Sequence, residues 1–159
     1  MPTDPLELIC QTIPAWFSAH QTTANKLEGA GKIAVAFGAG DVAVELLIHS
    51  SSGKISVSEL SVGTLFPARC SERHVQWDGT FCIGYQAGGG ISTLDAATVW
   101  WGLLEQFLRL QRVASRTRRW PVRQAVAHGA AGAHHLAALQ AARELGLEEE
   151  YYRMLEGEP

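Results

Sequence analysis

The first apolar pattern along the chain, from residue 4 to about residue 27, predicts a helix. Its apolar side chains recur at three- and four-residue steps, as they do on one face of a helix: Leu6, Ile9, Ile13, Trp16 and Phe17. Pro14 falls inside this pattern and predicts a kink or a split at that point. Gly29 and Gly31 are expected to end the helix.

Alternation of apolar and polar residues then predicts three strands, at 32–37, 42–49 and 55–62. The middle strand has an apolar face of Val42, Val44, Leu46 and Ile48. The third has Ile55, Val57 and Glu59 on one face, with Leu60 and Val62 on the other. Short turns at 38–41 and 50–53 separate the strands, so we expect an antiparallel meander of three or four strands.

Residues 64–90 break the periodic pattern and predict an ordered but irregular loop. Pro67, Gly79, Gly84 and the glycines at 88–90 punctuate it. Irregular segments of this length inside a compact domain are usually functional. The triple glycine lacks the lysine of a phosphate-binding loop, so no ATP site is predicted.

Helical spacing returns after the loop. Ser92 is predicted to cap a helix with Asp95 in its first turn, and Trp100 and Phe107 to lie in the core. Trp120-Pro121 ends this section, and a final helical section runs from about 130 to 155. The expected fold is therefore a single α+β domain over residues 1–159, with an N-terminal helix, the meander, the irregular loop and C-terminal helices.

Composition narrows the function. A net charge of -3 over 159 residues argues against generic nucleic-acid binding. No stretch has the apolar length of a membrane span, and residues 1–20 do not have the pattern of a secretory signal. Three cysteines without disulfide-framework spacing indicate reduced thiols and a cytoplasmic location.

One of these thiols stands where a turn would present it. Asp78-Gly79 is a turn pair, which would deliver residues 80–83 as a short extended piece. Phe81 and Ile83 would then point into the core, and Cys82 would point toward solvent. Alternation alone thus predicts an accessible thiol between two buried anchors.

Other interpretations compete with a reactive Cys82. Free cysteines are often small buried hydrophobes, which is what we expect of Cys10 and Cys70. A zinc site of Cys70, His74 and Cys82 is an alternative, although these donors lack a CxxC pair. Trp77 is interpreted either as a partner contact or as a lid on the loop. The histidines and arginines near the C-terminus suggest, more weakly, a metal site or an acidic partner: His128, His134, His135, Arg116, Arg118 and Arg119.

Beyond these patterns, the loop resembles ubiquitin-conjugating enzymes, most closely their divergent prokaryotic relatives. His74-Val75-Gln76 stands where that family has His-Pro-Asn, and Gly79-Thr80-Phe81-Cys82 stands at its catalytic cysteine. Arg119-Trp120-Pro121 and Ala127-His128-Gly129 also look like that group. The remaining matching positions are Pro67, Cys70, Glu72, Arg73 and Asp78. Val75 and Gln76 depart from the Pro and Asn of the tripeptide.

The resemblance implies a function. Cys82 would accept a ubiquitin-like protein as a thioester from a separate adenylating enzyme and pass it to an amine, without metal or cofactor. His74 would order the loop, Gln76 would stabilise the oxyanion with its amide, and Asp78 would form the turn and act on an incoming lysine. The expected partners are the ubiquitin-like protein, the adenylating enzyme and a JAB-type deconjugating peptidase, in a bacterial antiphage pathway. A module that binds the ubiquitin-like protein without catalysis is the main alternative.

Overall fold

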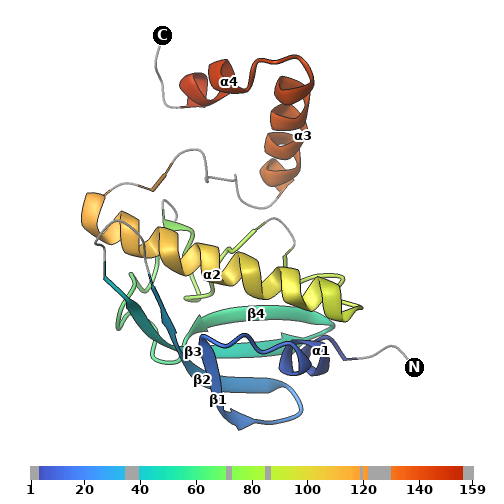
Figure 1. Ribbon diagram of the computed structural model, residues 1–159, viewed down its shortest axis with the longest axis vertical. Coiled ribbons are helices and arrows are strands. Elements are labelled where there is room, and N and C mark those ends of the chain that lie inside the picture. Colours follow the sequence, from blue (N-terminus) through green and yellow to red (C-terminus); the bar gives the residue numbers. More distant parts are fainter. Residues whose placement is uncertain are drawn as a thin grey trace.

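The computed structural model describes residues 4–34, 40–70, 73–84, 87–118, 120–121 and 130–155. A short helix precedes four strands, and three helices follow them (Figure 1). The elements are α1 Pro5–Gln11, β1 Phe17–Thr22, β2 Lys26–Ile33, β3 Val42–Ser51, β4 Lys54–Glu59, α2 Leu94–Thr117, α3 Ala130–Glu144 and α4 Glu148–Leu155. The predicted α+β class, with its antiparallel meander, is confirmed.

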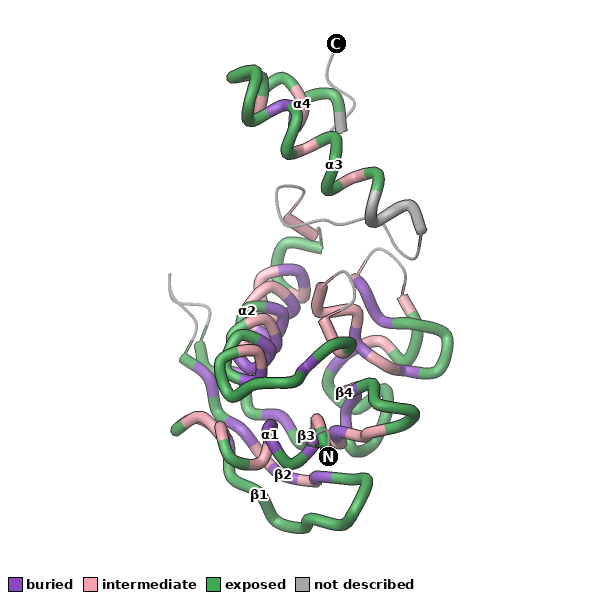
Figure 2. Tube along the Cα trace, turned by 90° about the vertical axis from the view of Figure 1, so that its right-hand side faces the viewer, coloured by how far each residue is buried: buried purple, intermediate pink, exposed green. Residues whose placement is uncertain are grey.

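The sheet is an antiparallel meander in the order β1-β2-β3-β4. Alternate residues of β2 and β3 are buried, as one face of a half-covered sheet requires. Helices α1 and α2 both contact β2 and β3 and lie on this buried face (Figures 1 and 2). The core therefore lies between the sheet and α2, whose buried side includes Trp100, Leu104 and Leu108.

The predicted helix at 4–27 is wrong beyond Gln11. The hydroxyl of Thr12 donates to the Leu8 carbonyl at 2.9 Å, and the Thr12 N–H donates to the Ile9 carbonyl at 3.3 Å, which closes the helix. Pro14 has no N–H with which to continue it. The chain instead enters β1 at Phe17, so the spacing that looked helical belongs to a helix, a turn and a strand.

Gly29 and Gly31 lie inside β2 and do not end a helix. A Cβ at Gly29 would stand 2.5 Å from Cζ of Phe17, and one at Gly31 would stand 2.6 Å from Cζ3 of Trp16. Gly29 therefore makes room for the Ser18 main chain and the Phe17 ring, and Gly31 makes room for the Trp16 ring.

Several other boundaries shift. Of the strand predicted at 32–37, Lys32 and Ile33 end β2, whereas 35–37 lie outside the described residues, as do turn residues 38 and 39. Thr93, not Ser92, caps α2, by accepting from the Ala96 N–H at 3.1 Å, and Asp95 lies in the first turn as predicted. The final section is two helices, because Gly146 breaks it with a φ of +71°.

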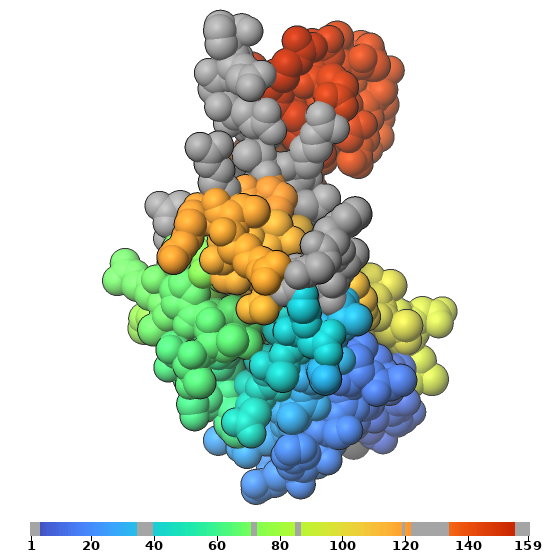
Figure 3. Space-filling model, turned by 60° about the vertical axis from the view of Figure 1, so that its left-hand side comes forward, coloured from blue at the N-terminus to red at the C-terminus, as the bar shows by residue number. Residues whose placement is uncertain are grey.

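Helices α3 and α4 form a hairpin that projects from the body, shown in red in Figure 3. The Tyr151 hydroxyl lies 3.1 Å from Nδ1 of His135 and joins the two helices. None of the helices in the described ranges is long and apolar enough to cross a membrane.

Strand β4 ends at Glu59 because that side chain turns the chain. Glu59 is 4% exposed, and its carboxylate accepts three backbone hydrogen bonds, from Gly63 at 3.1 Å, Leu65 at 2.6 Å and Phe66 at 3.2 Å. Bonds from N–H groups compensate the burial of a charge. The predicted strand over 55–62 is therefore too long by residues 60–62, which belong to this turn.

We expect Glu59→Gln to lower the free energy of unfolding by about 2 kcal/mol, because the amide presents an NH₂ group to backbone donors that need an acceptor. Urea unfolding followed by circular dichroism measures this. Glu45→Gln, on the exposed face of β3, is the matched control and is expected to change little. Equal unfolding midpoints for the two variants would contradict the role of Glu59.

Candidate active site

Residues 74–82 form a small antiparallel hairpin. Val75 lies opposite Phe81, and two backbone hydrogen bonds of 2.8 Å flank the pair, from Gln76 to Thr80 and from Cys82 to His74. Alternation on this hairpin points Val75 and Phe81 into the core, where they are 2% and 6% exposed. His74 and Cys82 therefore lie next to each other on the opposite face.

The hairpin is fixed to the sheet and to α2. The Phe81 N–H donates to the Val57 carbonyl at 2.8 Å, and Thr80 forms a bridge with Ser58, so the hairpin pairs with β4 at the edge of the sheet. The Phe81 ring stacks on Phe107 of α2 with centroids 4.9 Å apart. These contacts fix the position of the Cys82 backbone relative to α2.

The turn of the hairpin follows the predicted chemistry. Gly79 has a φ of +83°, and Oδ1 of Asp78 accepts from the Thr80 N–H at 3.0 Å and from its hydroxyl at 2.7 Å. Burial alone would raise the pKa of Asp78, but the hydrogen bonds from Thr80 outweigh it and lower that pKa. Asp78 thus acts as a turn-former.

The preceding residues are clamped to α2 by the side chain of Gln111, a role that the sequence did not predict. Gln111 is fully buried and accepts from Nε of Arg73 at 2.9 Å. Its side-chain amide nitrogen donates to the main-chain carbonyl of Arg73 at 2.5 Å. The main-chain carbonyl of Gln111 accepts from Nη2 of Arg73 at 3.0 Å. The sequence feature that could have predicted this clamp is a glutamine on an otherwise apolar face of a helix. The clamp holds the chain where His74 adopts a φ of +57°.

The backbone of Cys70 forms hydrogen bonds that close a turn with Arg73 and Val75. Its N–H donates to the Val75 carbonyl at 3.0 Å, and its carbonyl accepts from Val75 at 2.9 Å and from Arg73 at 3.1 Å. These bonds agree with a structural position for Cys70. Cys10 is partly buried against the core, as expected.

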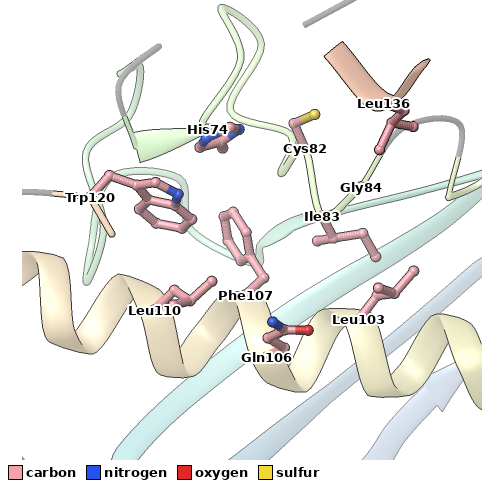
Figure 4. Close-up of a pocket in the computed structure, with 10 residues that line it drawn as sticks. All are labelled: His74, Cys82, Ile83, Gly84, Leu103, Gln106, Phe107, Leu110, Trp120 and Leu136. Carbon is pink, nitrogen blue, oxygen red and sulfur yellow. The ribbon is translucent and has the colours of Figure 1, made fainter. Parts of the chain in front are cut away.

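Cys82 lines a cavity of about 310 Å³, here called the Cys82 cavity (Figure 4). Most of its wall is apolar and comes from α2 and from residues beside Cys82. The lining residues are His74, Cys82, Ile83, Gly84, Leu103, Gln106, Phe107, Leu110, Trp120 and Leu136. Leu136 comes from α3, so the C-terminal hairpin borders the cavity.

Burial raises the pKa of the Cys82 thiol, and a hydrogen bond from the Gly84 N–H partly opposes that rise. Cys82 is half-buried, so its predicted exposure is too high. Ile83 lines the cavity beside it, whereas Phe81 is the deep anchor. The thiol is therefore mostly protonated at neutral pH.

Of the four predicted site residues, the structure brings His74 and Cys82 together at the cavity. Gln76 and Asp78 lie in the exposed turn and do not line the cavity. Trp77 is 79% exposed, which rules out the interpretation as a lid. Glu72, Arg119 and 127–129, including His128, lie outside the described residues.

Within the described ranges, no group of three or more His, Cys, Asp or Glu side chains is arranged to hold a metal ion. His135 instead contacts Tyr151. The Cys70, His74 and Cys82 alternative therefore has no support from geometry.

A family model described as Prokaryotic E2 domain matches residues 16–122. The chain belongs to this prokaryotic E2 family. The match spans the sheet, the hairpin and α2, whereas α1, α3 and α4 lie outside it. No curated protein and no solved structure matched the chain. Membership gives this E2 domain a conjugating role in general, and with it an interaction with a ubiquitin-like protein and an activating enzyme.

The clamp generates a prediction about coupling. Gln111→Leu and Arg73→Leu should each lower the free energy of unfolding by about 2 kcal/mol. They share the hydrogen bond from Nε of Arg73 to the Gln111 side chain, whereas each main-chain carbonyl bond is lost in one variant only. In urea unfolding, the double variant should therefore lose less than the sum of the two single losses.

Arg109→Leu is the control for that cycle. Arg109 bonds the Ala34 carbonyl and Glu105, so its effect should add to that of Gln111→Leu. Full additivity of the Arg73 and Gln111 effects would contradict the clamp.

The raised pKa of Cys82 predicts slow alkylation at neutral pH. Only the thiolate reacts. The rate of Cys82 alkylation by iodoacetamide should therefore keep increasing as the pH rises past about 8.5, the pKa of a free cysteine. Peptide mass spectrometry of Cys82 across pH measures this. In urea the midpoint should fall to the ordinary value, and a native midpoint at or below it would refute the effect of burial.

Proposed function

We propose that Cys82 of this E2 domain carries a ubiquitin-like protein as a thioester and passes it to an amine. The observation that supports this best is the position of Cys82. Cys82 pairs with His74 and lines an apolar cavity, on a hairpin bonded to the sheet, inside the region that matches the family. A rigid, partly desolvated nucleophile suits a reaction that depends on positioning.

The first step is transthiolation. The Cys82 thiolate attacks the carbonyl carbon of the donor thioester, the new carbon–sulfur bond forms, and the donor's thiolate leaves with the electron pair of the old bond. In the second step an acceptor amine attacks the same carbon. The carbon–nitrogen bond forms, the bond to Cys82 breaks, and the nitrogen gives up a proton to solvent while Cys82 recovers its thiolate or thiol.

The raised pKa of Cys82 serves this sequence. A thiolate of higher pKa is the stronger nucleophile once it forms, and it is the poorer leaving group once it is acylated. The same property slows both hydrolysis and aminolysis of the carrier thioester, so transfer depends on the positioning of the amine. The same burial makes the free thiol slow toward other electrophiles.

His74 and Gln76 are proposed in distinct roles. His74 is 7% exposed, and its carbonyl accepts from the Cys82 N–H, so it orders the backbone at the nucleophile. Gln76 shares the hairpin face of Cys82, and we propose that its amide faces the thioester oxygen from the solvent side. Asp78 holds the turn that leads to Thr80, and we propose that its carboxylate also acts electrostatically on the incoming lysine.

The partners follow from the family and from the loop motif. We propose that a separate adenylating enzyme supplies the thioester and that a JAB-type peptidase reverses the conjugation. We place the pathway in the bacterial cytoplasm and in antiphage defence. The motif from Pro67 to Cys82 supports these assignments by its resemblance to prokaryotic conjugation proteins.

A charging assay tests the carrier role. The E2 domain, the adenylating enzyme, the ubiquitin-like protein and ATP are expected to give an adduct that thiol removes on a gel. Cys82→Ala should abolish the adduct, Cys82→Ser should make it resistant to thiol as an oxygen ester, and Cys70→Ala should retain it. Binding of the ubiquitin-like protein without any adduct would favour the non-catalytic module.

A further inference from the structure

Trp77 is the most exposed large apolar side chain in the described part of the chain, at 79%. Tryptophan is mostly buried in folded proteins, and where it stays on the surface it is enriched at binding interfaces. Its place on the hairpin that carries Cys82 raises the question of what it binds.

The backbone that presents Trp77 is a fixed turn. The Gly79 N–H donates to the Gln76 carbonyl at 3.0 Å, so Trp77 and Asp78 are the two central residues of a β-turn. Gly79 follows with a φ of +83°, the usual end of a three-residue hairpin loop. A Cβ on Gly79 would stand 2.6 Å from Cγ1 of Val62, so Val62 packs directly against the turn. The indole therefore has a defined position in solvent.

A carboxylate accompanies the indole. Both hydrogen bonds from Thr80 end on Oδ1 of Asp78, and no hydrogen bond between the described residues uses Oδ2. Two arginines precede the turn in sequence. Arg73 bonds Gln111, and Arg69 forms no ion pair with Asp78 in the part of the chain that the structure describes. An exposed aspartate is ionised at neutral pH, so the turn offers its negative charge to a group from outside.

An aromatic face beside a carboxylate is complementary to a cation. The face of an indole attracts an ammonium or guanidinium group more strongly than the other aromatic side chains do. The carboxylate adds a charge-assisted hydrogen bond. A purely apolar partner that covered Trp77 would also take water from Asp78 without pairing its charge, which costs free energy. The turn therefore favours a basic side chain over an apolar one.

The turn lies too far from Cys82 to hold the amine that reacts. Gln76 pairs with Thr80 two residues along the hairpin from the pair of His74 and Cys82, and Trp77 is one residue further. Three strand rises of about 3.3 Å put Trp77 about 10 Å from the Cys82 backbone. The attacking lysine must also be neutral, so a cation bound at the turn belongs to another residue of the acceptor.

We propose that Trp77 and Asp78 bind a lysine or arginine side chain of the acceptor, about two to four residues of extended chain from the lysine that attacks the Cys82 thioester. This inference rests on the proposed carrier function and names its acceptor class, a polypeptide segment with a second basic residue near the target lysine. The bound cation keeps its charge and takes no part in proton transfer. It holds the attacking amine close to the thioester.

Acyl transfer from chemically charged protein tests this without the natural donor. The background is Cys10→Ala with Cys70→Ala, so that Cys82 is the only thiol of the chain. Cys82 attacks the acetylglycyl thioester of mercaptoethanesulfonate, and mercaptoethanesulfonate leaves. After excess reagent is removed, the lysine of a peptide attacks the acyl carbon, Cys82 leaves as its thiolate, and the nitrogen gives a proton to solvent. Mass spectrometry measures the acylated peptide.

Three peptides of equal length, blocked at both ends, separate charge from position. The first has arginine three residues before and three residues after its single lysine, and the second has neutral citrulline at both places. The third has its two arginines eight residues from the lysine, about 26 Å in an extended chain. The wild type should transfer to the first peptide about twofold to fivefold faster than to the other two, the range of an exposed cation–π contact.

The variants separate the aromatic face from apolar area and from charge. Trp77→Leu keeps an apolar side chain and should bring the three rates together, whereas Trp77→Phe keeps a weaker aromatic face and should retain part of the preference. Asp78→Asn keeps an oxygen for Thr80, removes the charge and should also reduce the preference. Leu65→Ala is the matched control, because it removes an exposed apolar side chain that follows β4, and it should leave the preference unchanged.

Equal transfer to the arginine and citrulline peptides in the wild type would overturn the proposal. A preference that survives Trp77→Leu would overturn it as well, and would mean that general negative charge selects the acceptor. The same holds if Trp77→Leu slows all three peptides equally, because Trp77 would then act without regard to the charge of the acceptor.

The carrier function and the acceptor site fail in different ways. If the charging assay gives a Cys82 adduct but the peptide preference ignores Trp77, the carrier function stands and the acceptor site falls. If the natural partners give no adduct but the chemically charged protein prefers arginine peptides through Trp77, the turn binds basic peptides and the carrier function falls.

Discussion

The pairing of Val75 with Phe81 is the constraint on which the site depends. It creates the hairpin that puts His74 beside Cys82, and it drives Phe81 onto Phe107. The same strand bonds to Val57, so the sheet and α2 hold the hairpin between them. Because both sides of the hairpin are fixed, the Cys82 backbone has little freedom to move relative to the helix, which is what a reaction limited by positioning requires.

The clamp of Arg73 on Gln111 extends this constraint to the chain that enters the hairpin. Its two residues are 38 apart in sequence, and a fully buried amide satisfies a guanidinium and a main-chain carbonyl together. His74 keeps a left-handed backbone, which costs free energy for a residue other than glycine. The neighbouring bonds maintain that conformation, and the His74 ring then rests on Trp120.

The chemistry of the site follows from its apolar surroundings. Burial disfavours the Cys82 thiolate and therefore favours the protonated thiol. The cavity beside it has mostly apolar walls, which suit a desolvated acyl chain better than a charged ligand. Leu136 brings the C-terminal hairpin to the rim of the same cavity, so α3 belongs to the surroundings of the nucleophile although it lies outside the family match.

Local chemistry determined much of this protein from sequence alone. Three local features could be predicted from the sequence because each depends on neighbours a few residues away. They are the alternation in 42–49, the Asp78-Gly79 turn and the motif around Cys82. The helix predicted over 4–27 was wrong because apolar spacing cannot tell a helix from a helix followed by an edge strand, and Pro14 decided between them. Only the tertiary structure showed that Gln111 clamps Arg73, that Glu59 caps the following turn and that Trp120 faces the Cys82 cavity. These roles depend on partners brought together by packing across the sheet and α2, and a side chain's burial and hydrogen bonds are properties of that packing.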